Sequence, residues 1–490
     1  MGIRIAGLAL WCAMMIPSPW AWPAAAQPSP GRPAAGRTSE RPALPALMAS
    51  FARLRGDALA WRRDEQFDAL LSALDRLPGH GLWPQHYHRD ALARHRGDYR
   101  LRDRLATEAW FSAATDLLHG RLDPRQFDSD WSASARAADL PHLLERALTD
   151  GDAGQALLAL APSHPEYRAL SRALSQLLAD PAGSVATPVA LPASRPLDEE
   201  PFLVRLFRDR DASAAPLPAS RAPISRVTPG RATQIARLRV NLERWRWLPD
   251  QLGARHVRVN LAAYRVDRVE NARVLQRHRA IVGDTVTRTP VFSDMIRYIV
   301  LNPWWETPHS IAVRDELPVF RAYPGAAREF GFQVLDRQGR VVDLASIDWR
   351  QVPANPFPYR LRQAPGPNNA LGRAKIMFPN RHDVYLHDTS APELFLEPER
   401  GFSSGCVRTD DIAGLSAWLL ETTPGWSRAR VQSLMASGRT ARVTLAQPVP
   451  VHILYFTAEP DGARIDGAIH FHDDIYARDQ RLLAALGRAR

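Results

Sequence analysis

The sequence predicts an α+β protein, in which a helical amino-terminal region precedes a mainly β domain. Apolar residues recur at every fourth position from Leu101 to Leu117, which is a helical spacing. From Val257 to Ala263 the larger apolar residues instead fall at every second position, as in a half-buried strand. A proline- and alanine-rich stretch, residues 180–230, separates the two patterns. We therefore expect two folded regions joined by a linker.

The helical region is expected to span residues 46–179. The helix that contains Leu101 to Leu117 should end before Gly120 and Pro124, because glycine and proline terminate helices. Residues 166–178 predict another helix, with leucines on one face.

The β domain is expected to span residues 231–490. It opens with a predicted helix, Thr233 to Leu248, whose Trp245 and Trp247 should pack against the sheet rather than form a sugar-binding platform. Short strand-like runs follow, at 257–263, 273–282, 295–301, 373–378, 383–387, 441–445 and 449–456. Between them lies a proline- and aromatic-rich excursion, residues 302–372, whose length indicates a lid or binding loop.

The amino terminus reads as an export signal. A short positive start, Met1 to Arg4, precedes an apolar run and then Ala24-Ala25-Ala26. We expect residues 1–26 to be a signal peptide, with an uncleaved anchor as the alternative, and residues 27–45 to be disordered. No later stretch is apolar enough to cross a membrane, so the expected location is the periplasm of a Gram-negative bacterium, with no transmembrane span after signal removal.

The charge excludes some partners. The net charge of +11 comes almost wholly from arginine, since Lys375 is the only lysine. We find no zinc-finger spacing, no basic helix with interleaved aromatics and no phosphate-binding glycine loop, so nucleic acid is not an expected partner. A cationic surface could still favour approach to an anionic polymer such as the cell wall.

Cys406 is the only cysteine outside the leader. An unpaired thiol in an exported protein is vulnerable to oxidation, so its presence suggests a nucleophile rather than a buried inert thiol. His387, 19 positions upstream, is the candidate base, and Asp388 is the candidate orienting group, through its side chain or its carbonyl. Arg408 could bind a substrate carboxylate. A helix expected at about 411–421, together with His387 and Arg408, should lower the pKa of the thiol.

His387 and the run Ser403-Ser404-Gly405-Cys406-Val407-Arg408 resemble the signature of L,D-transpeptidases with a YkuD-type catalytic domain, especially the larger YcbB-like branch. Further blocks of the chain resemble that branch in the same order: residues 120–124, 241–249, 302–305, 366–373, 378–380, 384–389 and 474–476. The first of these resembles the branch's helical scaffold domain.

The resemblance implies a chemistry. Cys406 would attack the carbonyl of diaminopimelate in a tetrapeptide stem, expel the terminal D-Ala, and pass the acyl group to an amine of a neighbouring stem as a 3→3 cross-link. His387 would be the acid and base, and the backbone N–H groups of Gly405 and Cys406 would form the oxyanion hole. No metal and no cofactor is implied. The remaining substrate-binding candidates are Ser403, Ser404, Tyr385, Trp304 and Asn369.

Two departures from the family pattern keep alternatives open. Ser404 stands where the family usually has histidine, and residues 180–228 are too short for the usual peptidoglycan-binding module. A hydrolytic variant (an L,D-carboxypeptidase, or an enzyme that releases a wall-anchored protein) and a non-catalytic wall-binding scaffold are the alternatives. The sequence does not fix the oligomeric state. His470, His472, Asp473 and Asp474 resemble a metal cluster but lack the spacing of one.

Overall fold

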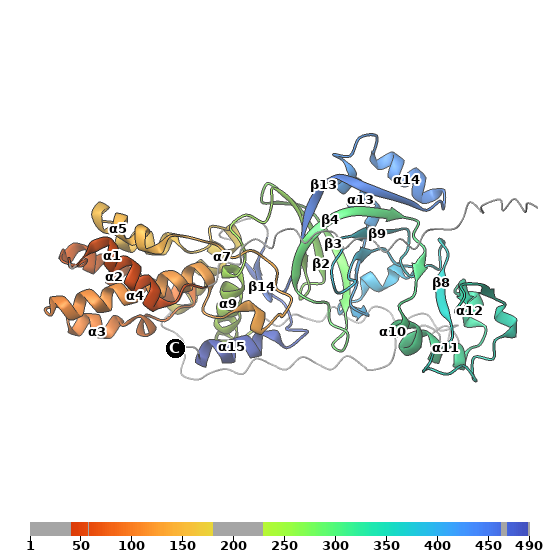
Figure 1. Cartoon of the computed structure of the whole chain (residues 1–490), viewed down its shortest axis with the longest axis horizontal. Helices are drawn as coiled ribbons and strands as arrows, with labels where there is room; N and C mark the ends of the chain where they lie inside the picture. The colour runs from red at the N-terminus through yellow and green to blue at the C-terminus, as the bar shows by residue number, and fades with distance from the viewer. Residues whose placement is uncertain (1–40, 57, 180–228, 462–467, 489–490) are drawn as a thin grey trace, which may run out of the picture. The chain divides into compact units, whose positions relative to one another are not determined.

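The computed structural model describes residues 41–56, 58–179, 229–461 and 468–488 (Figure 1). The predicted signal peptide and nearly all of the predicted linker lie outside these residues. Helix α1 begins at Leu44, inside the stretch predicted to be disordered. All described residues belong to one compact unit. None of the helices in these ranges is both long and apolar enough to cross a membrane.

The helical region forms as predicted. The helix over Leu101 to Leu117 is α4, which starts after the capping side chain of Asp98 and ends at Gly120, whose φ of 82° favours glycine. Helix α7 covers the second prediction. The elements are α1 (Leu44–Arg55), α2 (Asp64–Arg76), η1 (Leu77–His80), η2 (Pro84–Tyr87), α3 (Arg89–Arg94), α4 (Tyr99–His119), η3 (Pro124–Gln126), α5 (Leu140–Asp150), α6 (Ala153–Ala159) and α7 (Pro165–Ala179).

The β domain is built on one nine-stranded sheet, in the order β11-β3-β12-β10-β9-β4-β13-β1-β2. Because β2 also pairs with β3, the row closes on itself as a barrel. The strands are β1 (Arg255–Asn260), β2 (Arg265–Glu270), β3 (Arg273–Gly283), β4 (Phe292–Leu301), β9 (Ala374–Met377), β10 (Leu386–His387), β11 (Gly401–Ser403), β12 (Val407–Thr409) and β13 (Ala441–Leu454). The two runs predicted at 441–445 and 449–456 are one strand, β13, with an irregular register between Thr444 and Val449.

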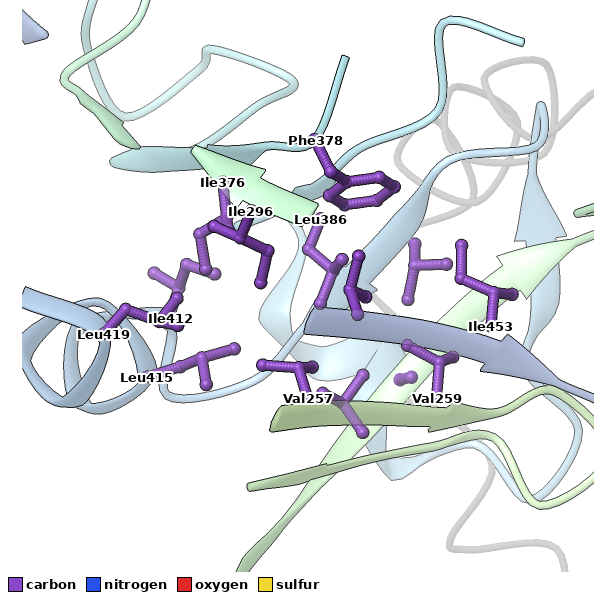
Figure 2. Close-up of a cluster of buried hydrophobic side chains, with 14 of the residues drawn as sticks. Val257, Val259, Ile296, Ile376, Phe378, Leu386, Ile412, Leu415, Leu419 and Ile453 are labelled. Atoms are coloured by element: carbon purple, nitrogen blue, oxygen red, sulfur yellow. The ribbon is translucent and has the colours of Figure 1, made fainter. Parts of the chain in front are cut away.

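The barrel encloses the main core. Figure 2 shows Val257, Ile376 and Leu386 from different strands pointing into one cluster. Helix α13 (Ile412–Leu420) closes one side with Ile412, Leu415 and Leu419, at helical spacing. The remaining elements of the domain are α9 (Arg231–Arg246), η6 (Pro392–Leu396), α14 (Arg428–Ala436), β14 (Ala458–Pro460), β15 (Ile469–Phe471) and α15 (Arg478–Arg488).

Strand β1 differs from its prediction as a half-buried strand. Five of its six residues are buried, because its polar side chains lie under the helical region instead of facing water. Arg258 forms an ion pair with Glu166 of α7 at 2.6 Å. The side-chain amide of Asn260 donates to the carbonyl of Phe456 at 3.0 Å. A polar residue in an alternating pattern therefore need not be exposed.

The helical region and the β domain share a boundary that we call the seam. Its apolar part combines α7, α9 and the end of β13, where Trp245 is stacked between His164 and Phe456 with ring centroids 4.2 and 4.9 Å away. Trp245 and Trp247 are both buried, but they pack within the seam rather than against the sheet alone, since the ring of Trp247 meets those of Phe127 and Trp131. Figure 1 shows α9 beside α7.

The polar part of the seam is also buried. On α9, Glu243 and Arg246 form an ion pair at 2.6 Å with both side chains at most 1% exposed. Glu243 also accepts from the backbone N–H of Leu122 at 2.8 Å, and Arg246 donates to the carbonyl of His80 at 2.8 Å. These contacts tie the β domain to the helical region through satisfied charges.

The excursion at 302–372 has a fold of its own, and we call it the lid. It contains a four-stranded sheet, β5-β8-β6-β7, and a separate core that includes Phe320, Phe332 and Trp349. Its elements are β5 (Trp305–Glu306), α10 (His309–Ile311), the π-helix η4 (Ala312–Glu316), α11 (Leu317–Ala322), α12 (Ala326–Glu329), β6 (Phe332–Leu335), β7 (Val341–Val342), η5 (Leu344–Ser346) and β8 (Arg360–Gln363). The aromatic residues that suggested a binding loop mostly form this core.

Candidate active site

The nucleophile and base candidates lie on neighbouring strands of the barrel. β10 and β12 run parallel, with Leu386 opposite Val407 and His387 opposite Arg408. Cys406 comes directly before β12, and the N–H of Val407 donates to the carbonyl of Tyr385 at 3.2 Å. Leu386 and Val407 point into the core. Because side chains alternate along a strand, Cys406 and His387 share the opposite face.

Arg408 and Tyr385 lie on this same face. The rings of Tyr385 and His387 meet edge to face, with centroids 5.6 Å apart. The structure thus brings together four of the predicted site residues, Cys406, His387, Arg408 and Tyr385.

The loop before Cys406 is held by internal hydrogen bonds. Gly405 has a φ of 115°, a region that favours glycine. Ser403 Oγ donates to the carbonyl of Cys406 at 2.5 Å and accepts from the N–H of Gly405 at 3.2 Å. The N–H of Gly405 is therefore already bonded in this conformation, and its part in an oxyanion hole stays a prediction. Ser403 acts on the loop rather than facing a substrate.

A second set of contacts supports the loop from below. Thr289 Oγ1 donates to the carbonyl of Gly405 at 2.9 Å and accepts from the N–H of Gly283 at 2.9 Å. Tyr476 Oη donates to the carbonyl of Gly283 at 2.6 Å and accepts from the N–H of Thr289 at 3.3 Å. Sequence reasoning missed both side chains, although the block at 474–476 was a signal for Tyr476.

His387 is neutral in this environment. It is 5% exposed, and burial, Arg408 and Lys375 lower its pKa to about 3, with the backbone of Asp388 acting in the opposite direction. Nδ1 of His387 makes no hydrogen bond of full geometry with the described residues, although the backbone of Asp388 lies close enough to raise its pKa. An imidazole in this state can accept a proton from a thiol.

Asp388 does not orient His387 with its side chain. Its carboxylate accepts from the N–H of Arg373 at 2.9 Å and packs against Gly372, where a Cβ would approach the carboxyl group to 2.5 Å. The backbone of Asp388 is the remaining candidate for the orienting role. The side chain fixes the turn that leads into β9.

The prediction of a lowered thiol pKa is wrong. Burial raises the pKa of Cys406 to about 11, although hydrogen bonding with Tyr385 and the charge of Arg408 lower it. The helix expected to help, α13, begins at Ile412 and is capped by Asp411, so β12 separates it from the thiol. Cys406 Sγ is half-buried and lies 3.6 Å from the carbonyl of Asp383.

Ser404 contacts the lid. Arg314 Nη2 donates to Ser404 Oγ at 2.7 Å, and Ser404 Oγ donates to Asp315 at 3.2 Å. Arg314 and Asp315 also form an ion pair with each other at 2.6 Å. The residue in place of the family's histidine therefore joins the nucleophile loop to the lid, and we call this the lid contact.

Asn369 and Trp304, both predicted to bind substrate, make contacts within the protein. Asn369 is 1% exposed, and its side-chain amide donates to the carbonyls of Pro303 and Ala364, both at 3.0 Å, so it fixes the base of the lid. Trp304 lies under the guanidinium of Arg362, 4.7 Å from its ring centroid. Burial and the charge of Cys406 raise the pKa of Tyr385, and a hydrogen bond with Trp305, which sequence reasoning did not select, acts in the opposite direction.

Within the described ranges, no three His, Cys, Asp or Glu side chains form a group that could hold a metal ion. His472, one member of the apparent cluster, forms an ion pair with Glu459 at 2.8 Å. Its neighbour His470 lies 3.5 Å from Asp461.

Comparison with known proteins agrees with this geometry. Residues 46–174 match the family model of a scaffold domain, and residues 254–431 match that of the YkuD L,D-transpeptidase catalytic domain. The chain is similar to a Haemophilus influenzae protein named "Putative L,D-transpeptidase", at 35% identity over 246 residues. The similarity covers 50% of this chain and 48% of the relative, so the chain spans about half the length of the curated relative it matches.

Among solved structures, L,D-transpeptidase 1 of Mycobacterium tuberculosis is similar at 12% identity, over 41% of this chain and 61% of that chain. Its TM-score of 0.16 is too low to support an argument. The relation to the YcbB-like branch stays a prediction. Residues 254–431 thus match the YkuD L,D-transpeptidase catalytic domain, and this stretch contains the adjacent strands that carry His387 and Cys406.

Proposed function

We propose that the protein is a peptidoglycan L,D-transpeptidase that forms 3→3 cross-links between stem peptides through a thioester on Cys406. The observation that carries this proposal is the placement of His387 and Cys406 on one face of the adjacent strands β10 and β12. The donor is a tetrapeptide stem, and the acceptor is the side-chain amine of diaminopimelate in a neighbouring stem. The reaction takes place in the periplasm.

The residues divide the reaction into two steps. Sγ of Cys406 bonds to the carbonyl carbon of diaminopimelate while His387 accepts the thiol proton. His387 then gives this proton to the nitrogen of the terminal D-Ala as the amide bond breaks and the thioester forms. In the second step the acceptor amine attacks the thioester, loses a proton to His387, and the thiol of Cys406 is regenerated.

The electrostatics support proton transfer during attack rather than a stored thiolate. With the pKa of Cys406 near 11 and that of His387 near 3, the resting pair is a thiol and a neutral imidazole. Arg408, opposite His387 on β12, would favour the thiolate as it forms. Tyr385 would help through its hydrogen bonding with the same sulfur.

The oxyanion that forms during attack needs hydrogen-bond donors, and the loop before Cys406 does not present both of its N–H groups in the resting state. The N–H of Gly405 is bonded to Ser403 Oγ, so it would have to turn toward the substrate to join the N–H of Cys406. A shift of this loop would also alter the lid contact at Ser404. We therefore propose that binding of the donor rearranges the loop and the lid together.

The test incubates the purified protein with a disaccharide-tetrapeptide and follows both the intact protein mass and the released muropeptides. We expect a covalent adduct and a 3→3 dimer with wild type and neither with Cys406→Ala. A tripeptide without dimer would instead identify a hydrolytic variant. Absence of both adduct and product, from folded protein whose thiol alkylates normally, would favour a non-catalytic wall-binding scaffold.

A further inference from the structure

The face that carries Cys406 has a row of three side chains in register. On the antiparallel pair β9–β10, Lys375 lies opposite His387, and on the parallel pair β10–β12, His387 lies opposite Arg408. Directly opposite residues of paired strands point to the same side of a sheet. His387 therefore stands between two cations, and the ammonium of Lys375 lies 5.5 Å from the ring centroid of Tyr385.

Lys375 differs from Arg246 and Arg258, two buried cations described above. Arg246 is paired with Glu243, and Arg258 is paired with Asp267 and Glu166. Within the described part of the chain, no carboxylate lies within ion-pair distance of Lys375, and no hydrogen bond of its ammonium is found. Burial lowers its pKa, while the charges of Cys406 and Glu306 act in the opposite direction.

A half-buried ammonium without a carboxylate loses hydration and gains little in return from this fold. This unfavourable loss of hydration occurs on the face of the sheet that carries Cys406. An anion that arrives there, next to the thiol and the ring of Tyr385, would supply the missing partner. Lysine suits this task because its ammonium is a compact charge with three donors on a flexible stem.

We propose that Lys375 forms a carboxylate-binding subsite beside Cys406, where it holds one carboxylate of the donor stem peptide. The choice of donor peptide as ligand rests on the proposed function. Two carboxylates come close to the reacting carbonyl: the carboxy terminus of the departing D-Ala, and the side-chain carboxylate of diaminopimelate. Lys375 then selects donors by charge, in addition to its effect on the pKa of His387.

A first experiment tests the subsite without any peptide. Iodoacetate and iodoacetamide both alkylate the thiolate of Cys406 with loss of iodide, but only iodoacetate carries a carboxylate. We expect the ratio of their rate constants to fall at least about fivefold in Lys375→Met, because one nearby positive charge is lost. Lys375→Arg should keep most of the ratio.

The matched control is Arg62→Met, which removes one charge from an exposed residue of the helical region. Its ratio should equal that of wild type. An unchanged ratio in Lys375→Met, with the variant folded by circular dichroism, would overturn the proposal. Because Lys375 is the only lysine, protein labelled with ¹³C at lysine Cε also gives one side-chain signal, which should shift when acetate is added.

A second experiment identifies the carboxylate. Acylation of wild type and Lys375→Met is followed by intact mass with three donors: the free tetrapeptide, one amidated at the terminal D-Ala, and one amidated on diaminopimelate. The amide that weakens acylation of wild type, but not of the variant, marks the carboxylate that Lys375 holds. Equal sensitivity of both proteins to both amides would overturn the donor assignment. If no donor acylates wild type, the proposed function fails, and the alkylation ratio alone still decides whether the subsite exists.

Discussion

The seam and the lid both border the catalytic barrel, but they are held by different kinds of contact. At the seam, Glu243 and Arg246 are at most 1% exposed and bonded to the helical region on both sides. At the lid contact, Arg314 is 45% exposed and reaches the exposed Ser404 through single hydrogen bonds. Buried, fully satisfied charges resist separation, whereas exposed ones separate at little cost. The comparison indicates that the seam fixes the barrel and that the lid contact can open.

The two regions also respond to pH in opposite directions. At the seam, His80 and His164 have pKa values lowered to about 4 and about 3, in each case mainly by burial. In the lid, burial followed by the charge of Asp315 raises the pKa of Glu316 to about 8. Within the described residues, Oε2 of Glu316 has no hydrogen-bond partner. A fall in pH below 6.5 should therefore weaken the seam, and a rise in pH from 4.5 to 8 should weaken the lid.

The largest effect is expected from breaking the seam. Glu243→Ala leaves Arg246 buried without its carboxylate and removes the acceptor of the Leu122 N–H. We expect the free energy of unfolding to fall by about 3–5 kcal/mol, measured by urea denaturation. The matched control is Asp75→Ala, which breaks an exposed pair with Arg89 and should cost less than about 1 kcal/mol. If both variants lost the same free energy of unfolding, the buried pair at the seam would be no stronger than an exposed pair.

The second-largest effect is expected from acid, which should weaken the seam by protonating its histidines. The folded pKa of His80 lies below its unfolded value of 6.5, so its contribution is present above pH 6.5 and is lost as the pH falls toward 4. We expect hydrogen exchange of α9 amides to report progressively weaker protection across this range. His80→Gln cannot titrate and should reduce this dependence. A seam whose stability is flat from pH 6.5 to 4 would show that these histidines are not buried in solution.

A rise in pH toward 8 should weaken the lid. The folded pKa of Glu316 lies above its unfolded value of 4.5, so its contribution is present below pH 4.5 and is lost as the pH rises through 8. We expect lid amides, such as those of α11, to lose protection as the pH rises from 4.5 to 8, while the seam does not. Glu316→Gln removes the charge and should keep the lid protected. Lid exchange that follows the seam at every pH would mean that the two regions open as one.

The smallest effect is expected at the lid contact. Ser404→Ala removes both hydrogen bonds to the lid, each worth about 1 kcal/mol. We expect a bulky maleimide to modify Cys406 up to about fivefold faster, with little change for the small iodoacetamide. Ser390→Ala, at another exposed serine, is the control. If both reagents change by the same factor, the substitution has altered the thiol itself and not access to it.

The sequence determined the features that depend on local pattern and residue chemistry. Helical spacing identified α4 and α7. Period-two spacing identified β1, and strand-like runs identified β3, β4, β9, β10 and β13 but not β2, β11 or β12. The single thiol outside the leader and the histidine upstream of it predicted that Cys406 and His387 belong to one site. The strand pairing of β10 and β12 places them on one face.

The tertiary structure decided what depends on burial and on distant partners. The pKa of Cys406 could not be predicted from its neighbours in sequence, because burial outweighs the charge of Arg408. Asn369 and the side chain of Asp388 hold structural positions because the fold brings Pro303 and Arg373 to them as partners. Lys375 came to the site only through the register of β9 with β10. Sequence fixes which groups are present, while packing decides which of them are desolvated and what they face.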